Sequence, residues 1–415
     1  MDELIEKALL ARKAWYELSR APDSLRRKAL ESMSQALVEN KEKIIEANLL
    51  DVNKFKEEKH DDPLLDRLIL NEKRLKSAAE GLKKVSQLPD PIGEVVEGWT
   101  TVHGLRIQKV RVPIGVIGVV YESRPNVTID LSGLAIKSGN AVILRGGSEA
   151  LNSNKAIVDV LRESIKDILD PNVIQFIENT DRSIVDKMLK LNGYLDLLIP
   201  RGSASFIDYV RRNATVPVIE TGAGNNHIFV NYDADLSMAT NIIINAKVQR
   251  PAVCNAVRKV LIHKDIAEKY IPILINELKK YGVTIKGDEK VRAIAHGVIL
   301  AKDEDWDEEY MDLTLAIKIV NSVEEAVEHI NKHGTKHSEA IITNNLNDAH
   351  YFTWNVDAAC TYVNASIRFT DGEQFGFGAE VGISTQKLHA RGPMGIKELT
   401  TTKYIIFGEG QTREI

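Results

Sequence analysis

The sequence predicts an α/β protein built on parallel strands, and three observations support this fold class. Residues 112–121 and 141–145 are apolar runs typical of strands that are buried on both faces of a sheet. A polar turn at 122–126 and a helical stretch ending near Lys137 separate them. Strand, helix and strand in this order predict a parallel βαβ unit. The alternation then continues to residue 219, with expected helices at 155–168 and 183–191 and expected strands at 173–178, 195–200 and 216–219.

Composition excludes several classes of protein. The chain has 415 residues, which favours two or three domains over one core. A net charge of -5 with interspersed signs gives no reason to expect a nucleic-acid or membrane partner. Two cysteines suit a reducing compartment. The acidic amino end lacks a cationic leader, and no apolar run approaches the ~18 residues of a membrane span. We therefore expect a cytoplasmic protein.

The elements before the first parallel strand are helices and a hairpin. Apolar residues at helical spacing over 25–37 and over 75–85 predict two helices. From residue 94 the apolar residues alternate, and a turn at Gly104 predicts a hairpin over 97–111. A hairpin cannot bury both of its faces, so we expect an arm for contact between subunits.

The ends of three expected strands carry candidate binding residues. Arg145, Gly146, Gly147 and Ser148 stand where nucleotide-binding folds commonly have an acidic residue for the ribose, and a cation there suits the 2′-phosphate of NADPH. An ordinary strand-ending arginine beside a tight turn is the alternative. Two further candidates come later in the chain: the Gly202 and Ser203 helix start, whose amides can hold a phosphate, and Glu220, a general base or a solvated loop residue.

Cys254 is the candidate nucleophile. It precedes the strand-like run 257–262, in a segment that also carries Lys247 and Arg250. A thiol reacts as the thiolate, and a free cysteine titrates near ~8.5 unless cations or helix-terminal amides favour the charged form. An unpaired cysteine is otherwise a buried apolar filler. Cys360 lies in an apolar strand pattern without an adjacent cation, so we expect it to be a core residue.

Four segments carry a resemblance to a known family: 249–256, 329–339, 368–372 and 389–395. With Glu220 and its glycine loop ahead of Cys254, the chain resembles the aldehyde dehydrogenase superfamily, and within it the γ-glutamyl phosphate reductase (glutamate-5-semialdehyde dehydrogenase) family. The resemblance covers essentially the whole chain. It implies an aldehyde dehydrogenase-like α/β fold in three parts: a Rossmann-like coenzyme-binding domain (1–96, 112–225 and 361–379), a second α/β domain with the catalytic thiol (226–360), and a β oligomerisation arm (97–111 and 380–415) that makes a homo-oligomer.

The resemblance also implies an activity. This is the NADPH-dependent reduction of L-glutamate 5-phosphate, delivered from a glutamate kinase, to the 5-semialdehyde and phosphate in proline biosynthesis. Cys254 matches the family nucleophile, Arg145 lies where the adenosine ribose is held, and Glu309 aligns with the glutamate that binds the nicotinamide ribose. A thiolate can attack the acyl phosphate and expel phosphate, and the resulting thioester accepts hydride.

Two positions depart from the family pattern. Ser123 replaces the asparagine whose amide stabilises the oxyanion in aldehyde dehydrogenases. The amide of Cys254, or the side chain of Ser123 or Asn126, is then the candidate donor. Arg258 stands where a glutamate is expected, and the sequence offers no physical account of it.

The substrate's phosphate and α-carboxylate call for cations, and the candidates are Arg250, His333, Lys336 and His337. Histidines four apart could instead bind a metal, but a glycine intervenes and no third ligand lies nearby, so we predict no metal site. A solvated loop is the third interpretation.

Two other functions remain open. One is an NAD-dependent hydrolytic semialdehyde dehydrogenase that uses Glu220 to activate water. The other is a catalytically silent scaffold. Cys254 argues against the scaffold, and Arg145 and Ser123 argue against the hydrolytic enzyme.

Overall fold

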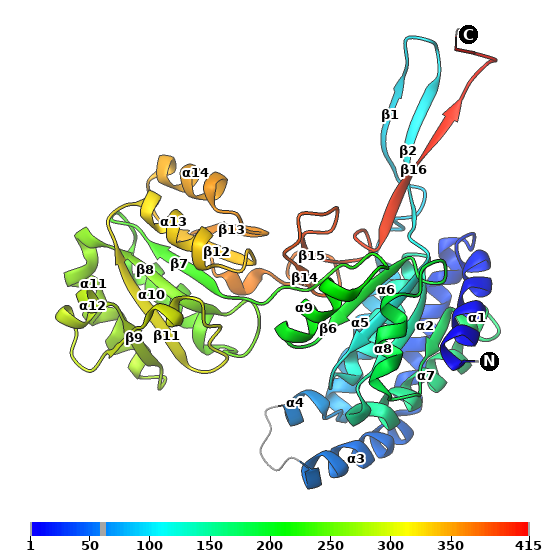
Figure 1. Cartoon of the computed structure of the whole chain (residues 1–415), viewed down its shortest axis with the longest axis horizontal. Helices are drawn as coiled ribbons and strands as arrows, with labels where there is room; N and C mark the ends of the chain where they lie inside the picture. Colours follow the sequence, from blue (N-terminus) through cyan, green and yellow to red (C-terminus); the bar gives the residue numbers. More distant parts are fainter. Residues whose placement is uncertain (1, 59–63, 414–415) are drawn as a thin grey trace. The chain divides into compact units, whose positions relative to one another are not determined.

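The computed structural model describes residues 2–58 and 64–413, and the chain forms two compact units (Figure 1). Unit 1 comprises Met1–Thr221, Gly376–Gly382 and Met394–Ile415. Unit 2 comprises Gly222–Phe375 and Ile383–Pro393. Residues 1, 59–63, 414 and 415, which fall in the predicted coenzyme domain and arm, lie outside the described residues.

Helices precede the sheet of unit 1: α1 (Glu3–Leu18), α2 (Asp23–Glu39), α3 (Lys41–Glu58), α4 (Leu64–Leu68) and α5 (Glu72–Gln87). The predicted helices over 25–37 and 75–85 are confirmed as α2 and α5. The stripe of α2 that includes Leu30 and Met33 is buried, as is the stripe of α5 that includes Leu75 and Leu82, and the two helices pack together.

The sheet of unit 1 is parallel, with strand order β5-β4-β3-β6. Its strands are β3 (Val116–Tyr121), β4 (Ala141–Gly146), β5 (Ile174–Phe176) and β6 (Leu197–Arg201). Every residue of β3 and β4 is buried, as the apolar runs require. The chain moves outward from β3 to β4 and β5 and then returns to β6 on the other side of β3. Ligands of open α/β sheets bind at the carboxyl ends of the strands beside such a reversal.

The strands of unit 1 are connected by helices: α6 (Pro125–Lys137), η1 (Ser148–Ala150), α7 (Leu151–Ile165), η2 (Pro171–Val173), α8 (Arg182–Leu189) and α9 (Ala204–Asn213). The predicted strand over 216–219 is wrong, because the structure has only an isolated bridge between Leu198 and Val218 there. Pro217 explains the difference, since proline has no N–H to donate to a ladder.

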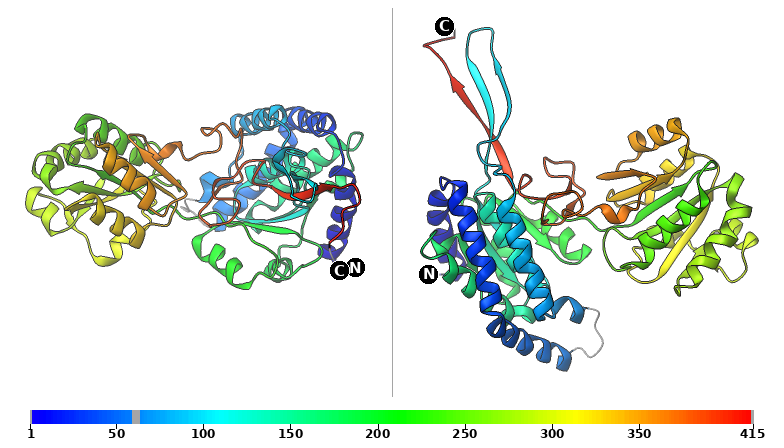
Figure 2. Two further views of the ribbon diagram at one scale, coloured as in Figure 1. Left: turned by 90° about the horizontal axis from the view of Figure 1, so that it is seen from above. Right: turned by 180° about the vertical axis from the view of Figure 1, so that it is seen from behind.

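The predicted hairpin is confirmed and is joined by the C-terminal strand. β1 (Val95–Thr100) pairs antiparallel with β2 (Arg106–Pro113), and β16 (Thr400–Phe407) pairs with the other edge of β2. This ribbon, which we call the arm, extends from the helices and sheet of unit 1 (Figure 2). It exposes Trp99, Tyr404, Ile406 and Phe407, and the side chain of Trp99 packs edge-on against Tyr404.

Unit 2 is built on a second parallel sheet, with strand order β10-β9-β11-β8-β7-β12-β13. Its strands are β7 (Asn226–Val230), β8 (Val257–His263), β9 (Thr284–Gly287), β10 (Ile299–Leu300), β11 (Thr314–Val320), β12 (Ser338–Ile342) and β13 (Cys360–Val363). One face packs on α10 (Leu236–Val248), α11 (Lys264–Lys279) and α12 (Glu289–Ile294), and the other on α13 (Val323–His333) and α14 (Leu346–Asn355) (Figure 1). The short elements are η3 (Asp303–Trp306), η4 (Ile367–Phe369), β14 (Ile383–Ser384) and β15 (Gly392–Pro393).

The predicted domain boundaries need correction in unit 2. Residues 361–375 belong to this unit rather than to the coenzyme domain, because β13 continues its sheet, with Ser338 opposite Cys360. The segment 383–393, predicted as part of the arm, also belongs here, and Arg391 forms an ion pair of 2.9 Å with Asp357. The arm strands themselves cluster with unit 1.

Candidate functional site

Cys254 lies in a turn at the amino end of β8, as the sequence predicts. We call residues 249–256 the thiol turn. Cys254 is half-buried. Helix α10 ends just before the turn, so it presents backbone carbonyls rather than amides there, and the helix-terminal amides expected for Cys254 do not come from α10. Cationic side chains are the other source of positive charge that the sequence predicts for the thiol.

Two asparagines hold the thiol turn, one from outside it and one from within it. The Asn226 side chain donates hydrogen bonds to the carbonyls of Cys254 (2.7 Å) and Ala256 (2.9 Å). The Asn255 side chain donates to the carbonyls of Arg368 (3.2 Å) and Thr370 (2.9 Å). These bonds fix the backbone from which the thiol projects, which is the requirement for a well-placed nucleophile.

Arg258, the residue without a role in the sequence analysis, is a further support of the thiol turn. Its guanidinium is fully buried and donates to the carbonyls of Pro251 and Val253, each at 2.8 Å. Its Nη2 also lies 3.8 Å from Oε1 of Glu309. Burial lowers the pKa of Arg258, while Glu309 and Cys254 act in the opposite direction. The Arg258 guanidinium is therefore a buried cation that holds the turn carrying Cys254.

Glu309 is fixed against the same turn. Its Oε1 accepts a hydrogen bond of 2.8 Å from the amide of Gly224. A Cβ on Gly224 would lie 1.5 Å from the carbonyl oxygen of Cys254, so the two backbones are in direct contact. Behind Glu309, buried Lys259 donates to the carbonyl of Glu308 at 2.6 Å, and burial lowers the pKa of Lys259 to about 7. Glu309 and Cys254, the candidates for coenzyme binding and for nucleophilic attack, thus share one support.

The predicted substrate cations are not gathered in one place. His337 is fully buried, and burial and then the charge of Arg258 lower its pKa to about 3, so the expectation of a cationic His337 is wrong. His333 lies 2.8 Å from Asp307. Lys336 pairs with Asp357 at 3.1 Å, and Arg250 is exposed in the thiol turn. The expectation that Cys360 is a core residue is also wrong, since it is half-buried on the sheet edge.

In unit 1, Ser123 follows β3 at a strained position with φ of 32°. Its amide and its hydroxyl both donate to Oε1 of Glu149, each at 2.6 Å. A hydroxyl has one proton, so Ser123 is not available as the oxyanion donor in this arrangement, and that expectation is corrected. Asn126 is exposed at the start of α6 and remains the side-chain candidate.

The unit 1 residues expected to hold the coenzyme lie at the carboxyl ends of β4 and β6. Arg145 is 8% exposed and donates to the carbonyl of Thr180 at 2.7 Å, and burial lowers its pKa. Gly146 ends β4, Gly147 follows it, and Ser148 begins η1. A Cβ on Gly147 would meet the Glu149 carboxylate at 2.2 Å.

Gly202 and Ser203 start a helix, as the sequence predicts. The Ser203 hydroxyl caps α9 by accepting from the amide of Phe206 at 3.3 Å. The Ser203 amide donates to Glu122 at 3.1 Å, which shows that an anionic group fits at this helix start. Glu220 is partly buried, and burial raises its pKa against the opposing charge of Arg211, which is the direction a general base requires.

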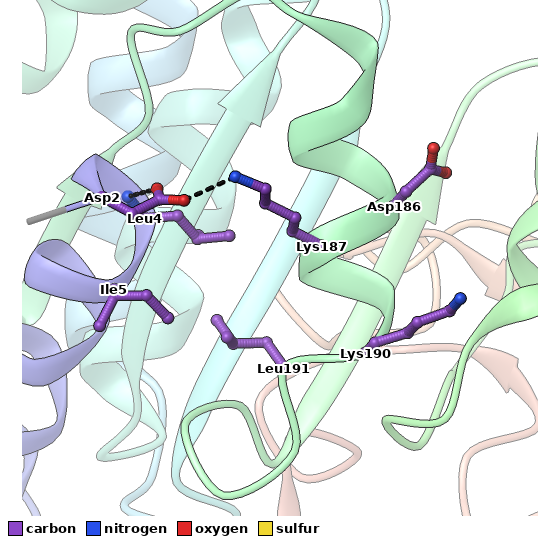
Figure 3. A pocket seen from close by; sticks show the side chains of 7 residues that line it. All are labelled: Asp2, Leu4, Ile5, Asp186, Lys187, Lys190 and Leu191. Carbon is purple, nitrogen blue, oxygen red and sulfur yellow. Dashed lines mark hydrogen bonds and ion pairs between the residues drawn. The ribbon is translucent and has the colours of Figure 1, made fainter.

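Other features of the described chain do not point to a different site. Residues 2–58 and 64–413 contain no group of three or more potential metal ligands and no helix long and apolar enough to cross a membrane. A hollow between α1 and α8 is lined by Leu4, Ile5, Leu191 and a polar pair (Figure 3). In that pair Lys187 lies 2.6 Å from Asp2, which caps α1. The ion pair therefore stabilises the N-terminus of α1.

Comparison with known proteins shows the family. The profile of the aldehyde dehydrogenase family matches residues 1–312. The γ-glutamyl phosphate reductase of Thermotoga maritima is 53% identical over 415 residues, which is all of both chains. That of Clostridium botulinum is 56% identical over 414 residues, again with full coverage. The chain belongs to the γ-glutamyl phosphate reductase family of aldehyde dehydrogenases. Membership of the aldehyde dehydrogenase family implies a nicotinamide coenzyme.

Solved structures confirm the aldehyde dehydrogenase-like fold. The crystal structure of γ-glutamyl phosphate reductase from Thermotoga maritima matches with a TM-score of 0.97 at 52% identity, over 100% of each chain. An acetylating aldehyde dehydrogenase from Geobacillus thermoglucosidasius matches with a TM-score of 0.72 at 16% identity, over 100% of this chain and 98% of that one. This second match supports the fold alone.

Several residues of this family member escaped the sequence analysis. Asn226, Glu149 and Asp357 act through partners distant in the chain, whereas Arg258, which has no role in the sequence analysis, donates to carbonyls of the adjacent turn. For Asn226 a weak signal exists, because an asparagine at the start of an apolar strand needs a buried partner. For Arg258 the signal is a cation inside the apolar run 257–262.

Proposed function

We propose that the chain catalyses the NADPH-dependent reduction of L-glutamate 5-phosphate to L-glutamate 5-semialdehyde and phosphate, in proline biosynthesis. The thiol turn carries this proposal, because Cys254 is half-buried, is held by three buried side chains and has a cation behind it. The relatives from Thermotoga maritima and Clostridium botulinum bear the corresponding name.

The chain's residues divide the work of the reaction. Cys254 attacks the acyl carbon as a thiolate, the bond from that carbon to the phosphate oxygen breaks, and a thioester forms. The Cys254 amide and Asn126 are the candidate donors to the oxyanion, and Arg250 suits the departing phosphate. NADPH, when bound, supplies the hydride that reduces the thioester. Cys254 then leaves as the thiolate as the aldehyde forms.

The residues present fit a nicotinamide coenzyme. Glu309 has one carboxylate oxygen anchored on Gly224 and would hold the nicotinamide ribose. The α9 start at Gly202 and Ser203 would take the pyrophosphate, since its amide already binds a carboxylate. Arg145, with Gly146, Gly147 and Ser148, would distinguish NADPH from NADH through the 2′-phosphate.

The proposal extends to the setting of the enzyme. The exposed Trp99, Tyr404, Ile406 and Phe407 of the arm favour a homo-oligomer in which a second copy covers these side chains. The acyl phosphate is short-lived in water, so delivery from a glutamate kinase in the cytoplasm fits the chemistry. We propose no metal and no nucleic-acid or membrane partner.

The test is the oxidation of glutamate 5-semialdehyde with and without inorganic phosphate. A reductase that takes an acyl phosphate returns the acyl group to phosphate, so we expect NADPH formation to depend on phosphate and to saturate with it. The raised pKa of Glu220 favours the second candidate, a hydrolytic NAD-dependent enzyme. Steady formation of NADH or NADPH in phosphate-free buffer, with glutamate as the product, would establish that candidate. Absence of any turnover by folded protein would support the scaffold.

A further inference from the structure

A cluster of charges in unit 2 joins Lys336, one of the candidate substrate cations, to two cations that have had no part so far. Asp357, just before β13, forms ion pairs with Lys336 (3.1 Å), Lys387 (2.8 Å) and Arg391 (2.9 Å). These cations, Lys387 first, hold the pKa of Asp357 below its usual range. Three positive charges therefore share one carboxylate, which leaves an excess of two. We call these four residues the Asp357 cluster.

The Asp357 cluster and the thiol turn lie at the same edge of one sheet. The strands β8, β7, β12 and β13 are consecutive neighbours and parallel, so their amino ends meet at that edge. Asn226 bonds the carbonyl of Cys254 on one side and accepts from the amide of Ser338 at 3.3 Å on the other. Neighbouring strands lie ~4.8 Å apart, so β12 and β13 are roughly 10 and 14 Å from β8.

We propose that Lys336, Lys387 and Arg391 form a second anion subsite, which binds the α-carboxylate of the substrate while Cys254 engages the acyl end. This inference rests on the proposed function. Four C–C bonds of ~1.5 Å separate the acyl carbon from the carboxylate carbon, a span of roughly 5 Å. The side chains of Cys254 and of the long cations cover the remaining distance. Asp357 holds the three cations together, and their excess charge attracts the carboxylate.

The alternative is a structural clamp that fastens the segment 383–393 to the sheet. A clamp needs one cation for one carboxylate, whereas here three are present. The side chains of Lys336 and Lys387 are 49% and 61% exposed, so both can reach a ligand. Lys336 also has a φ of 64°, a left-handed backbone that is strained for a lysine. Such strain is common at binding sites.

The experiment compares two aldehydes that differ only in the carboxylate. These are glutamate 5-semialdehyde and 4-aminobutanal, and both are oxidised at saturating phosphate. We expect Lys387→Ala and Arg391→Ala each to lower kcat/KM for glutamate 5-semialdehyde about tenfold, mainly through KM, because a charge-assisted contact is lost. The value for 4-aminobutanal and the KM for phosphate should not change. Lys397→Ala is the matched control, since Lys397 is a half-exposed lysine that pairs with Glu94 at 2.9 Å in unit 1.

A second measurement covers the case of slow turnover of 4-aminobutanal. Glutamate and 4-aminobutanoate are tested for protection of Cys254 against iodoacetamide, and the two variants should weaken protection by glutamate alone. Equal losses for both aldehydes or both acids would show a clamp and overturn the proposal. If the variants lose neither activity toward the aldehydes nor protection by the acids, the proposal is also overturned. A raised KM for phosphate in the variants would overturn it as well. Phosphate-independent oxidation by the unmodified enzyme is a different result, because it contradicts the reductase and not the subsite.

Discussion

The two units place their candidate residues at opposite ends of parallel strands. In unit 1, Ser123 and Ser203 follow the carboxyl ends of β3 and β6, and Arg145 is the penultimate residue of β4. In unit 2, Cys254 and Lys336 precede the amino ends of β8 and β12. The carboxyl edge of an α/β sheet faces helix N-termini, and the amino edge faces helix C-termini. The two edges therefore stabilise negative charge by different means.

At the edge of unit 1 backbone amides bind carboxylates, whereas the thiol turn of unit 2 is held mainly by side chains that donate to backbone carbonyls. The Ser203 amide binds Glu122, and the Ser123 amide binds Glu149. Around the thiol turn the donors are instead the side chains of Asn226, Asn255 and Arg258. A backbone amide donor remains when its residue is replaced by any amino acid except proline, whereas a side-chain donor is lost when that residue is replaced. We therefore expect point substitutions to be more damaging at the unit 2 edge.

The largest effect should come from the thiol itself. Cys254→Ala removes the covalent step, so we expect phosphate-dependent oxidation of glutamate 5-semialdehyde to fall at least about a thousandfold, with coenzyme affinity nearly unchanged. Cys360→Ala, at the same edge, should be nearly silent. Similar losses in two folded variants would contradict the assignment of the nucleophile.

Arg258→Met tests the support behind the thiol. It leaves the carbonyls of Pro251 and Val253 without their buried donor, so we expect a loss of roughly 2–4 kcal/mol in the free energy of unfolding. The turnover rate should fall as well, because the turn loosens. Denaturant unfolding and kcat measure the two effects.

Lys247→Met is the matched control for Arg258→Met. Lys247 is also fully buried, but its Nζ has no hydrogen-bond partner among the described residues, and burial lowers its pKa to about 7. Its replacement should be neutral or stabilising. If Lys247→Met destabilises the protein as much as Arg258→Met, buried charge in general matters here and not the two carbonyl contacts.

Arg145→Ala tests the unit 1 edge. We expect the substitution to weaken the binding of NADPH by about 1.5–3 kcal/mol and the binding of NADH much less, because only NADPH has a 2′-phosphate. Fluorescence titration of both coenzymes measures the difference. Arg162→Ala is the control, since Arg162 also binds backbone carbonyls in unit 1, those of Pro171 and Ile174. Equal weakening of NADPH and NADH would assign Arg145 a structural role.

The buried histidines of unit 2 make the free energy of unfolding depend on pH. The expected change for each histidine and each pH unit is the smallest effect predicted here. Burial lowers the pKa of His337 and of His329 to about 3, below the ~6.5 of an unfolded chain. Unfolding between these values takes up protons, so stability is complete above pH ~6.5 and is lost as the pH falls toward ~3. Each histidine contributes a slope of ~1.4 kcal/mol per pH unit in that window. Urea unfolding from pH 7 to 5 measures it, and exposed His103→Asn should leave the slope unchanged.

The sequence predicts the local features of this molecule well. The buried runs of β3 and β4, the hairpin and the turn that carries Cys254 follow from apolar patterning and turn residues within a few positions. Pro217 could have warned against a strand over 216–219. Half-burial of Cys360 depends on β13 being at the sheet edge, which no local pattern reveals.

The supporting contacts could not be predicted, because they join residues far apart in the chain. Asn226 meets Cys254 across 28 positions, and Ser123 meets Glu149 across 26. The burial of His337 could not be predicted either. A histidine among basic residues is expected to be a surface cation, and only the folded sheet shows that it is buried. Arg258 becomes intelligible only with the carbonyls of the thiol turn in view.

Gly224 has a consequence for how this chain can vary. Its α-carbon lies so close to the thiol turn that a Cβ would stand 1.5 Å from the carbonyl oxygen of Cys254. The obstacle is backbone rather than a flexible side chain, so no rotamer relieves it. Every mutation of a glycine codon that changes the amino acid adds at least that carbon. No other amino acid is therefore expected to be tolerated at position 224, although Gly224 performs no chemistry. A mutant library that varies this loop should keep Gly224.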